Sequence, residues 1–118
     1  MGECIFCKIV RGEAPSQKVY EDDSVYAFRD INPVAPTHVL IVPKEHIPGV
    51  QEMKPEHERV VGHMFLVAKV IAEELGLAPR NTEGGYRLVF NVGKAAGQTV
   101  FHLHLHLIGG RTMAWPPG

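Results

Sequence analysis

The hydrophobic positions in the second half of the chain predict one long helix over about residues 55–75. Apolar residues recur there at the three- to four-residue spacing of one helix face. The recurring residues are Val60, Met64, Val67, Ile71 and Leu75. Pro55 suits a first helical turn, where its missing N–H costs no hydrogen bond, and Gly76 followed by Pro79 marks the end.

Runs of β-branched and aromatic residues between turn signals predict the strands. Asp22-Asp23 separates the first two runs, so we expect a hairpin there. The predicted strands cover residues 18–21, 24–29, 37–42, 86–92 and 100–108, and a short helix covers about residues 4–11. Loops containing proline or glycine occupy residues 31–36 and 93–99. Helices and strands do not alternate strictly, which favours an α+β fold with a largely antiparallel sheet, in one domain over residues 1–118.

The composition is that of an ordinary globular protein, and it excludes several classes of function. Apolar residues make up 45% of the chain and charged residues 21%, which argues against disorder. The formal net charge is −1, whereas a sequence-independent nucleic-acid binder needs a basic surface. The longest purely aliphatic run covers residues 39–42, too short to span a membrane. Lys8 and Arg11 interrupt the apolar stretch that a signal peptide needs, which favours a cytoplasmic location.

Histidine and leucine alternate over residues 102–107, and this motif is the most informative part of the sequence. Successive side chains of a strand point to opposite faces, so His102, His104 and His106 are expected on one face and the leucines on the other. The leucine face packs on the core. Thr, Lys or Glu would be equally suitable on a face that only contacts solvent, so three histidines at this spacing indicate a catalytic or metal-binding role.

Two kinds of chemistry fit this histidine face. Imidazoles at i and i+2 can bind one metal ion, or one imidazole can be a nucleophile or general base that its neighbours orient. The preceding loop offers backbone N–H groups at Gly93 and Gly97, the amide of Gln98 and the hydroxyl of Thr99, groups that hold phosphate oxygens. This loop favours phosphoryl or nucleotidyl transfer. The sequence shows no carboxylate near the motif, which weakens the metal interpretation.

Cys4 and Cys7 stand in a single C-x-x-C unit and are the only cysteines. Such a pair supplies half of a tetrahedral zinc site, which two histidines complete. The alternatives are a redox pair or two small buried apolar side chains. We expect His57 and His63, on the predicted long helix, to be ordinary surface or flank residues and not ligands.

Longer blocks of sequence accompany the histidine motif, which is followed by Leu107-Ile108. These blocks cover residues 4–9, 27–31, 36–47, 97–101 and 109–118. Together and in this order they resemble the histidine triad family, and the ending is similar to its nucleotide-binding branch. The resemblance implies a five-stranded sheet with one long and one short helix, and a homodimer in which two sheets join. The tail, residues 111–118, would then reach the partner's site.

The resemblance also implies a role for each site residue. His104 would be the nucleophile that takes the nucleotidyl group, His106 would contact the phosphate, and His38 and His102 would complete a hydrogen-bonded network. The implied nucleotide contacts are Asp30 at the ribose, Phe28 and Ile31 at the base, Asn91, Gly97, Gln98 and Thr99 at the phosphate or leaving group, and Trp115 from the partner. On local sequence alone, Asp30 fits a turn residue equally well, Phe28 and Ile31 fit the core, and Trp115 fits a loosely packed tail.

The activity that the resemblance implies is hydrolysis of purine nucleoside 5′-phosphoramidates through a nucleotidyl-histidine, without a catalytic cofactor. A structural zinc ion would be held by Cys4, Cys7, His46 and His102. The alternatives are a dinucleoside polyphosphate hydrolase, a non-catalytic nucleotide-sensing or adaptor protein, and a metalloprotein with the histidines as ligands. Thr99 stands where the family frequently has Ser, and Ala114 where animal relatives have His, so leaving-group specificity is expected to differ.

Overall fold

An antiparallel sheet forms the centre of the computed structural model, which describes residues 4–80 and 83–118. Its five strands lie in the order β1-β2-β3-β5-β4, and every neighbouring pair is antiparallel. The strands are β1 (Lys18–Glu21), β2 (Val25–Arg29), β3 (Thr37–Pro43), β4 (Tyr86–Val89) and β5 (Leu105–Gly109). The predicted α+β fold and the predicted hairpin of β1 and β2 are confirmed.

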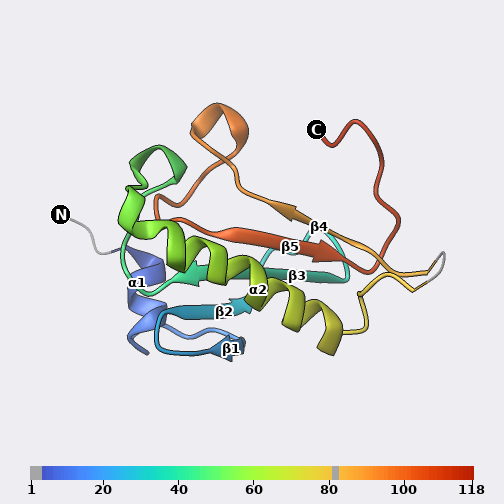
Figure 1. The fold of residues 1–118 in the computed structure, drawn as a ribbon, viewed down its shortest axis with the longest axis horizontal. Coiled ribbons are helices and arrows are strands. Elements are labelled where there is room, and N and C mark those ends of the chain that lie inside the picture. The colour runs from blue at the N-terminus through green and yellow to red at the C-terminus, as the bar shows by residue number, and fades with distance from the viewer. Residues whose placement is uncertain (1–3, 81–82) are drawn as a thin grey trace.

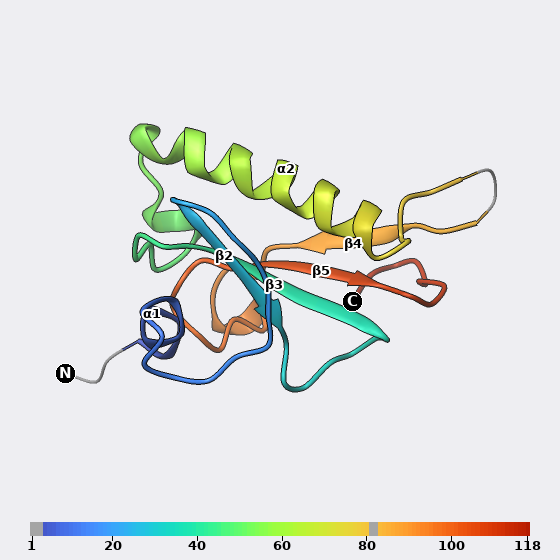
Figure 2. The ribbon, with the colours of Figure 1, turned by 90° about the horizontal axis from the view of Figure 1, so that it is seen from below.

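Two helices cover opposite faces of this sheet, as Figure 2 shows. The long helix α2 (Glu58–Glu74) crosses one face, and the short helix α1 (Ile5–Val10) lies against the other near the N-terminus (Figure 1). A 3-10 turn over Pro55–His57 precedes α2, so the predicted helix begins at the expected proline but tightens in its first turn. Gly76, with φ of +75°, ends it as expected.

Each face of the sheet has its own hydrophobic cluster. Under α2, the side chains of Leu103, Leu105 and Leu107 pack with Met64 and Ile71, and all of them are fully or almost fully buried. Each fully buried leucine contributes roughly 1.5–3 kcal/mol relative to an exposed one. On the opposite face the cluster consists of Phe6, Ile9, Tyr26, Phe28, Leu40 and Val42. The sheet is therefore covered on both faces, and the histidines lie on the side of the smaller helix.

The last strand is shorter than predicted, and the backbone explains the difference. Pro43 ends β3 and has no N–H to offer a facing strand. The N–H of Leu103 donates instead to the carbonyl of Ile47, at 2.6 Å, and the ladder between β3 and β5 begins only at Leu105. β4 pairs with β5 only as far as Val89, which faces His106, so the predicted strands 86–92 and 100–108 were too long.

The two histidines of the long-helix region have defined partners. His63 Nε2 lies 2.6 Å from Asp22 Oδ2, a contact that joins α2 to the turn of the first hairpin. His57 is buried, accepts the N–H of Lys54 at Nδ1 and approaches Glu45 through Nε2 at 3.0 Å. His57 thus lies at the flank of α2 and is buried, whereas His63 is partly exposed.

None of the helices in the described ranges is long and apolar enough to cross a membrane.

Candidate active site

The three histidines of the motif share one side of the chain, as predicted, although His102 and His104 precede the strand β5. Alternation continues through this extended segment, because the leucines enter the cluster under α2 while the histidines face α1. Phe6 of α1 packs edge-on against the rings of His102 and His104, with centroids 5.9 and 5.1 Å away. The histidine face is therefore largely buried and is not a solvent-exposed polar face.

The orientation of His104 leaves one ring nitrogen available for chemistry. Its Nδ1 lies 2.7 Å from the carbonyl oxygen of His102, which can only accept a hydrogen bond. We therefore assign the proton of the neutral ring to Nδ1, which leaves a lone pair on Nε2. Burial lowers the pKa of His104, which keeps the ring neutral. A neutral, fixed imidazole with an open Nε2 is suited to nucleophilic attack.

A second chain of hydrogen bonds runs through His38 and His106. The N–H of Val34 donates to His38 Nδ1 at 3.2 Å, so the proton of neutral His38 belongs on Nε2. That Nε2 lies 2.9 Å from His106 Nδ1 and 3.4 Å from Asp30 Oδ2. His106 then accepts at Nδ1 and carries its own proton on Nε2, which lies 3.5 Å from Asn91 Nδ2, a nitrogen that cannot accept it. His106 thus presents an N–H donor to the site.

Burial keeps this group of imidazoles uncharged near neutral pH. It is the main cause that lowers the pKa of His106 to about 4, and the nearby rings of His104 and His38 add to the effect. Burial also lowers the pKa of His38, against the opposing influence of Asp30. The histidines would therefore stabilise a phosphate with N–H dipoles and not with full positive charges.

A cavity of about 280 Å³ opens beside His104 and His106. Helix α1 supplies one apolar wall with Ile5, Phe6 and Ile9, and the sheet supplies the other with Phe28 and Leu40. Asp30 and Ile31 lie at its edge, where Ile31 is 90% exposed. Asp30 Oδ1 accepts the N–H of Asn32 at 2.8 Å, and the carboxylate retains further lone pairs. The α1 wall was missed from the sequence.

The glycine-containing loop divides into a lining part and a supporting part. Gly97 and Thr99 line the cavity, and Gly97 has a φ of +98°, which favours glycine. Gln98 is buried between them: its amide donates to the carbonyls of Pro48 and Val100 and accepts the N–H of Gly93. These bonds use both donors of that side chain, so Gln98 holds the loop in shape and does not line the cavity.

Asn91 and Trp115 lie on the other side of His106, in a separate hollow of about 700 Å³ that His38 also lines. Trp115 is 83% exposed, so the expectation that it stays out of the core is confirmed. The tail is held there by Arg87, which donates to the carbonyl of Ala114 at 2.8 Å. Trp115 thus lines a hollow of its own chain.

Cys4, Cys7, His46 and His102 converge with their ligand atoms all within 4.8 Å of one another. His102 Nδ1 lies 3.4 Å from Cys4 Sγ and 3.2 Å from His46 Nδ1, and Cys7 Sγ lies 3.3 Å from His46 Nδ1. Bonds of about 2.0–2.3 Å around a tetrahedral zinc ion give ligand separations of roughly 3.3–3.8 Å. His102 Nε2 donates to the carbonyl of Pro43 at 2.8 Å, which leaves Nδ1 able to bind a metal. The donor set fits zinc.

Asp30, His38 and His106 also bring a carboxylate and two imidazoles together. The sequence-based view that no carboxylate lies near the motif was therefore wrong, because Asp30 is distant from it in sequence and adjacent only after folding. The N–H of Val34 nevertheless occupies His38 Nδ1 and keeps the proton on the Nε2 that faces this group. That proton makes the arrangement a hydrogen-bonded relay more readily than a metal site.

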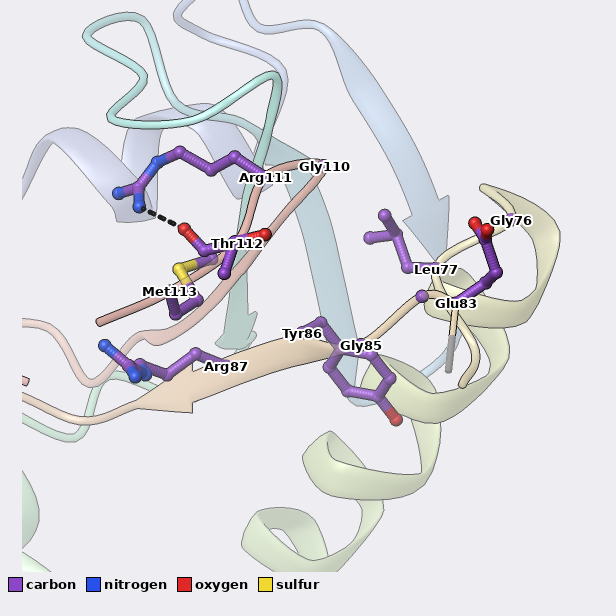
Figure 3. Close-up of a pocket in the computed structure, with 11 residues that line it drawn as sticks. Gly76, Leu77, Glu83, Gly85, Tyr86, Arg87, Gly110, Arg111, Thr112 and Met113 are labelled. Atoms are coloured by element: carbon purple, nitrogen blue, oxygen red, sulfur yellow. Dashed lines mark hydrogen bonds between the residues drawn. The ribbon is translucent and has the colours of Figure 1, made fainter. Parts of the chain in front are cut away.

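A further hollow, of about 640 Å³, lies near the end of α2 and the segment that follows β5. Figure 3 shows it between Gly76 and Leu77 on one side and Arg111 and Thr112 on the other, with Arg111 donating to the carbonyl of Thr112. Its described lining holds no histidine, cysteine or serine. The cavity beside His104 is the candidate active site, because it is lined by His104 itself, whereas the hollow at Trp115 reaches His38 and His106 only.

The fold and the site define a small α+β protein with an oriented imidazole beside an apolar slot and a phosphate-binding type of loop. Residues 11–113 match the model of the HIT domain, the domain of the histidine triad family. The chain is 52% identical over 111 residues to the purine nucleoside phosphoramidase of Escherichia coli, covering 94% of this chain and 90% of that protein. This chain belongs to the histidine triad family.

Two further relatives bear on the site and the fold. The chain is 50% identical to the 14 kDa zinc-binding protein of Zea mays, over 97% of this chain and 87% of that protein. The crystal structure of a HIT family hydrolase from Legionella pneumophila superposes with a TM-score of 0.92 at 49% identity, covering 98% of this chain and all of that one. The family assignment supports hydrolase activity and nucleotide binding.

Proposed function

We propose that this protein hydrolyses purine nucleoside 5′-phosphoramidates. The observation that carries the proposal is the orientation of His104, whose Nδ1–H is held by the carbonyl of His102 while Nε2 is left with a lone pair. The cavity beside it has an apolar slot for a base, a carboxylate for ribose hydroxyls and a glycine-containing loop for phosphate oxygens. The identity to a purine nucleoside phosphoramidase supports the same substrate class.

The reaction proceeds in two displacements at the α-phosphorus. Nε2 of His104 attacks, the phosphorus–nitrogen bond to the amine breaks, and the amine leaves with a proton from water. His106 donates its Nε2–H to the phosphate oxygens, together with the backbone N–H and the hydroxyl of Thr99. The N–H of Gly97 takes no part, because it donates to the carbonyl of Lys94 at 3.0 Å. Water then attacks the nucleotidyl-histidine and gives up a proton, which neutralises the hydroxide left by the first step. The bond to Nε2 breaks, and the nucleoside monophosphate leaves with His104 restored as a neutral ring.

The slot and its edge determine how the nucleotide would be held. The base lies between α1 and Phe28, covered by the exposed Ile31, and Asp30 accepts the ribose hydroxyls. Asn91 lies on the far side of His106, where the leaving amine would emerge. Burying Ile31 under a base would remove an exposed apolar side chain from water.

The Cys4, Cys7, His46 and His102 cluster is proposed to hold a structural zinc ion. The zinc-binding relative and the ligand separations support it. A bound zinc ion would supply a cross-link between the start of α1 and the sheet. All four tetrahedral positions would be filled by side chains, so no position would be open to substrate.

The cytoplasmic location expected from the sequence stays a prediction.

A homodimer is proposed through the free edge of β4 and the adjoining side of α2. β4 is the last strand of the sheet and has one unpaired edge in the described chain. Phe65 of α2 packs edge-on against Phe90, just after β4, and Leu66 and Val70 are exposed on the same helix. An open edge beside exposed apolar side chains is typical of an interface.

Trapping the covalent intermediate tests the proposed activity. The protein is mixed with adenosine 5′-phosphoramidate, quenched within milliseconds and analysed as intact protein by mass spectrometry. We expect a mass increase of one adenylyl group, located at His104 by peptide mapping. Absence of the adduct, together with near-normal turnover by a folded His104→Ala variant, would refute the mechanism. Undiminished turnover in excess chelator would separate it from the metalloprotein alternative.

A further inference from the structure

Two hydroxyl groups meet at the edge of the cavity and have no part in the mechanism above. Ser16 Oγ and Tyr26 Oη are 3.0 Å apart. Tyr26 is buried and packs against Phe28, with ring centroids 6.0 Å apart. Ser16 is half-buried and lines the cavity, and it also lines an adjoining hollow that continues past Asp30 and contains none of the histidines. The pair therefore lies at the non-phosphate end of the site.

Strand geometry fixes where this pair lies relative to the proposed nucleotide. The N–H of Arg29 donates to the carbonyl of Gln17 at 3.0 Å, which places Ser16 beside Asp30 at the end of β2. Tyr26 and Phe28 are two residues apart on β2 and share the face that carries the slot. Ser16 thus lies between the carboxylate proposed for the ribose and the apolar walls proposed for the base.

The hydrogen bonding of the pair leaves Ser16 with unused capacity. Phenolic O–H is a stronger donor than an aliphatic hydroxyl, and a buried phenol needs a partner. Tyr26 therefore donates to Ser16 Oγ, which leaves the hydrogen of Ser16 and a second lone pair for another partner. Among the described residues Ser16 Oγ makes no other side-chain hydrogen bond, although the carboxylate of Asp30 lines the same cavity.

We propose that Ser16, positioned by Tyr26, is the residue that hydrogen-bonds the edge of the bound purine and that this contact lets the site bind adenine and guanine alike. This inference rests on the proposed function. A hydroxyl can donate to a ring nitrogen or to the carbonyl of guanine, and it can accept from an exocyclic amine. Arg29 lines the same edge, but a guanidinium has donors only. Ser16 is thus suited to either purine.

The test compares ligands with and without a base. Calorimetry gives the affinities of AMP, GMP and ribose 5-phosphate for the wild type and for the variants Ser16→Ala, Ser16→Thr and Tyr26→Phe. We expect Ser16→Ala to weaken the binding of AMP and GMP about five- to tenfold and to leave the binding of ribose 5-phosphate unchanged. Ser16→Thr keeps the hydroxyl and should retain most of the affinity. Tyr26→Phe should have a smaller effect in the same direction, because it removes only the orienting bond.

A matched control removes a phenolic hydroxyl elsewhere. Tyr86→Phe, on β4 at the edge of the other cluster, should leave all three affinities unchanged. Unchanged AMP and GMP affinities in folded Ser16→Ala, or an equal loss for ribose 5-phosphate, would overturn the role of Ser16 while leaving the proposed function intact. A wild-type protein that binds AMP and GMP no better than ribose 5-phosphate would overturn both.

Discussion

The Nδ1–H of His104 donates to the backbone carbonyl of His102, 2.7 Å away, and this bond sets which nitrogen of the proposed nucleophile is open. Between them lies Leu103, whose side chain is buried on the opposite face. The imidazole of His102 belongs to the Cys–His cluster. One residue therefore takes part in the candidate metal site with its ring and orients His104 with its carbonyl.

The His104→Ala variant is expected to bind AMP nearly normally but to lose turnover by at least about a thousandfold, because no neighbouring group has the same reach. Steady-state kinetics and calorimetry on the same preparation measure the two effects. The control is His63→Ala, on α2 and bonded to Asp22, which should keep full turnover. Near-normal kcat in folded His104→Ala would remove this residue from its role.

The double variant Cys4→Ala, Cys7→Ala should contain no zinc and unfold at a temperature lower by about 5–15 °C, with some activity retained. The reason is that the cluster links the start of α1 to the sheet without facing the substrate. Metal analysis of protein purified without added zinc and thermal unfolding check it. His57→Gln, at a buried histidine outside the cluster, should lose stability but keep its zinc. Less than about a tenth of a zinc ion per wild-type chain would contradict the zinc proposal.

Stability should fall as the pH is lowered from 7 to 5. Burial lowers the pKa of His106 to about 4, whereas the unfolded chain takes up this proton near pH 6.5. Between these values the unfolded state binds more protons, so acid favours unfolding. For His106 alone the loss at pH 5 is at most about 2 kcal/mol. Urea unfolding of metal-stripped protein, compared with His106→Gln, measures it. An equal pH dependence in the two proteins would contradict this assignment.

Deleting residues 113–118 should change leaving-group specificity more than folding. Trp115 is exposed and lines a hollow next to His38, Asn91 and His106. The ratio of kcat/KM for a phosphoramidate of a bulky amine to that of ammonia should change several-fold, because only the larger group reaches the tail. Circular dichroism monitors folding. An unchanged ratio in a stably folded truncated protein would show that the tail does not contact the leaving group.

The Leu66→Lys variant should shift the proposed dimer towards monomer, because it places a charge in the exposed apolar side of α2. Light scattering across a range of concentrations measures the mass. Glu73→Lys places the same side chain, in place of a carboxylate, at another exposed position on α2 near its end, and should leave the mass unchanged. A wild-type protein that is monomeric at all concentrations, or a dimeric Leu66→Lys variant, would contradict the interface.

Periodicity predicted most of the fold because burial and spacing are local properties of the sequence. The long helix, the first hairpin and the separation of histidines from leucines follow from patterns that need no partner. The start of β5 does not, because it depends on which residue faces Pro43 across the sheet. A proline that ends one strand limits the facing strand only once the two are paired.

The candidate site likewise has a part that the sequence predicts and a part that it does not. The histidine motif and the Cys pair are visible as short motifs, and the folded chain brings His46 and His102 to the two cysteines. The groups that orient the rings are backbone atoms: the carbonyls of His102 and Pro43 and the N–H of Val34. Every residue type carries such atoms, so no sequence signal distinguishes them. The wall formed by α1 was hidden for another reason, since Phe6 resembles any core residue.

Phe6 packs against three rings at once, those of His102, His104 and Phe28. The same side chain is a wall of the slot and a cover for the cluster that joins the N-terminal segment to the sheet. Docking of the first helix and formation of the binding site are therefore one event. A protease cut or fusion that detached this helix would abolish the proposed base binding with every histidine still in place.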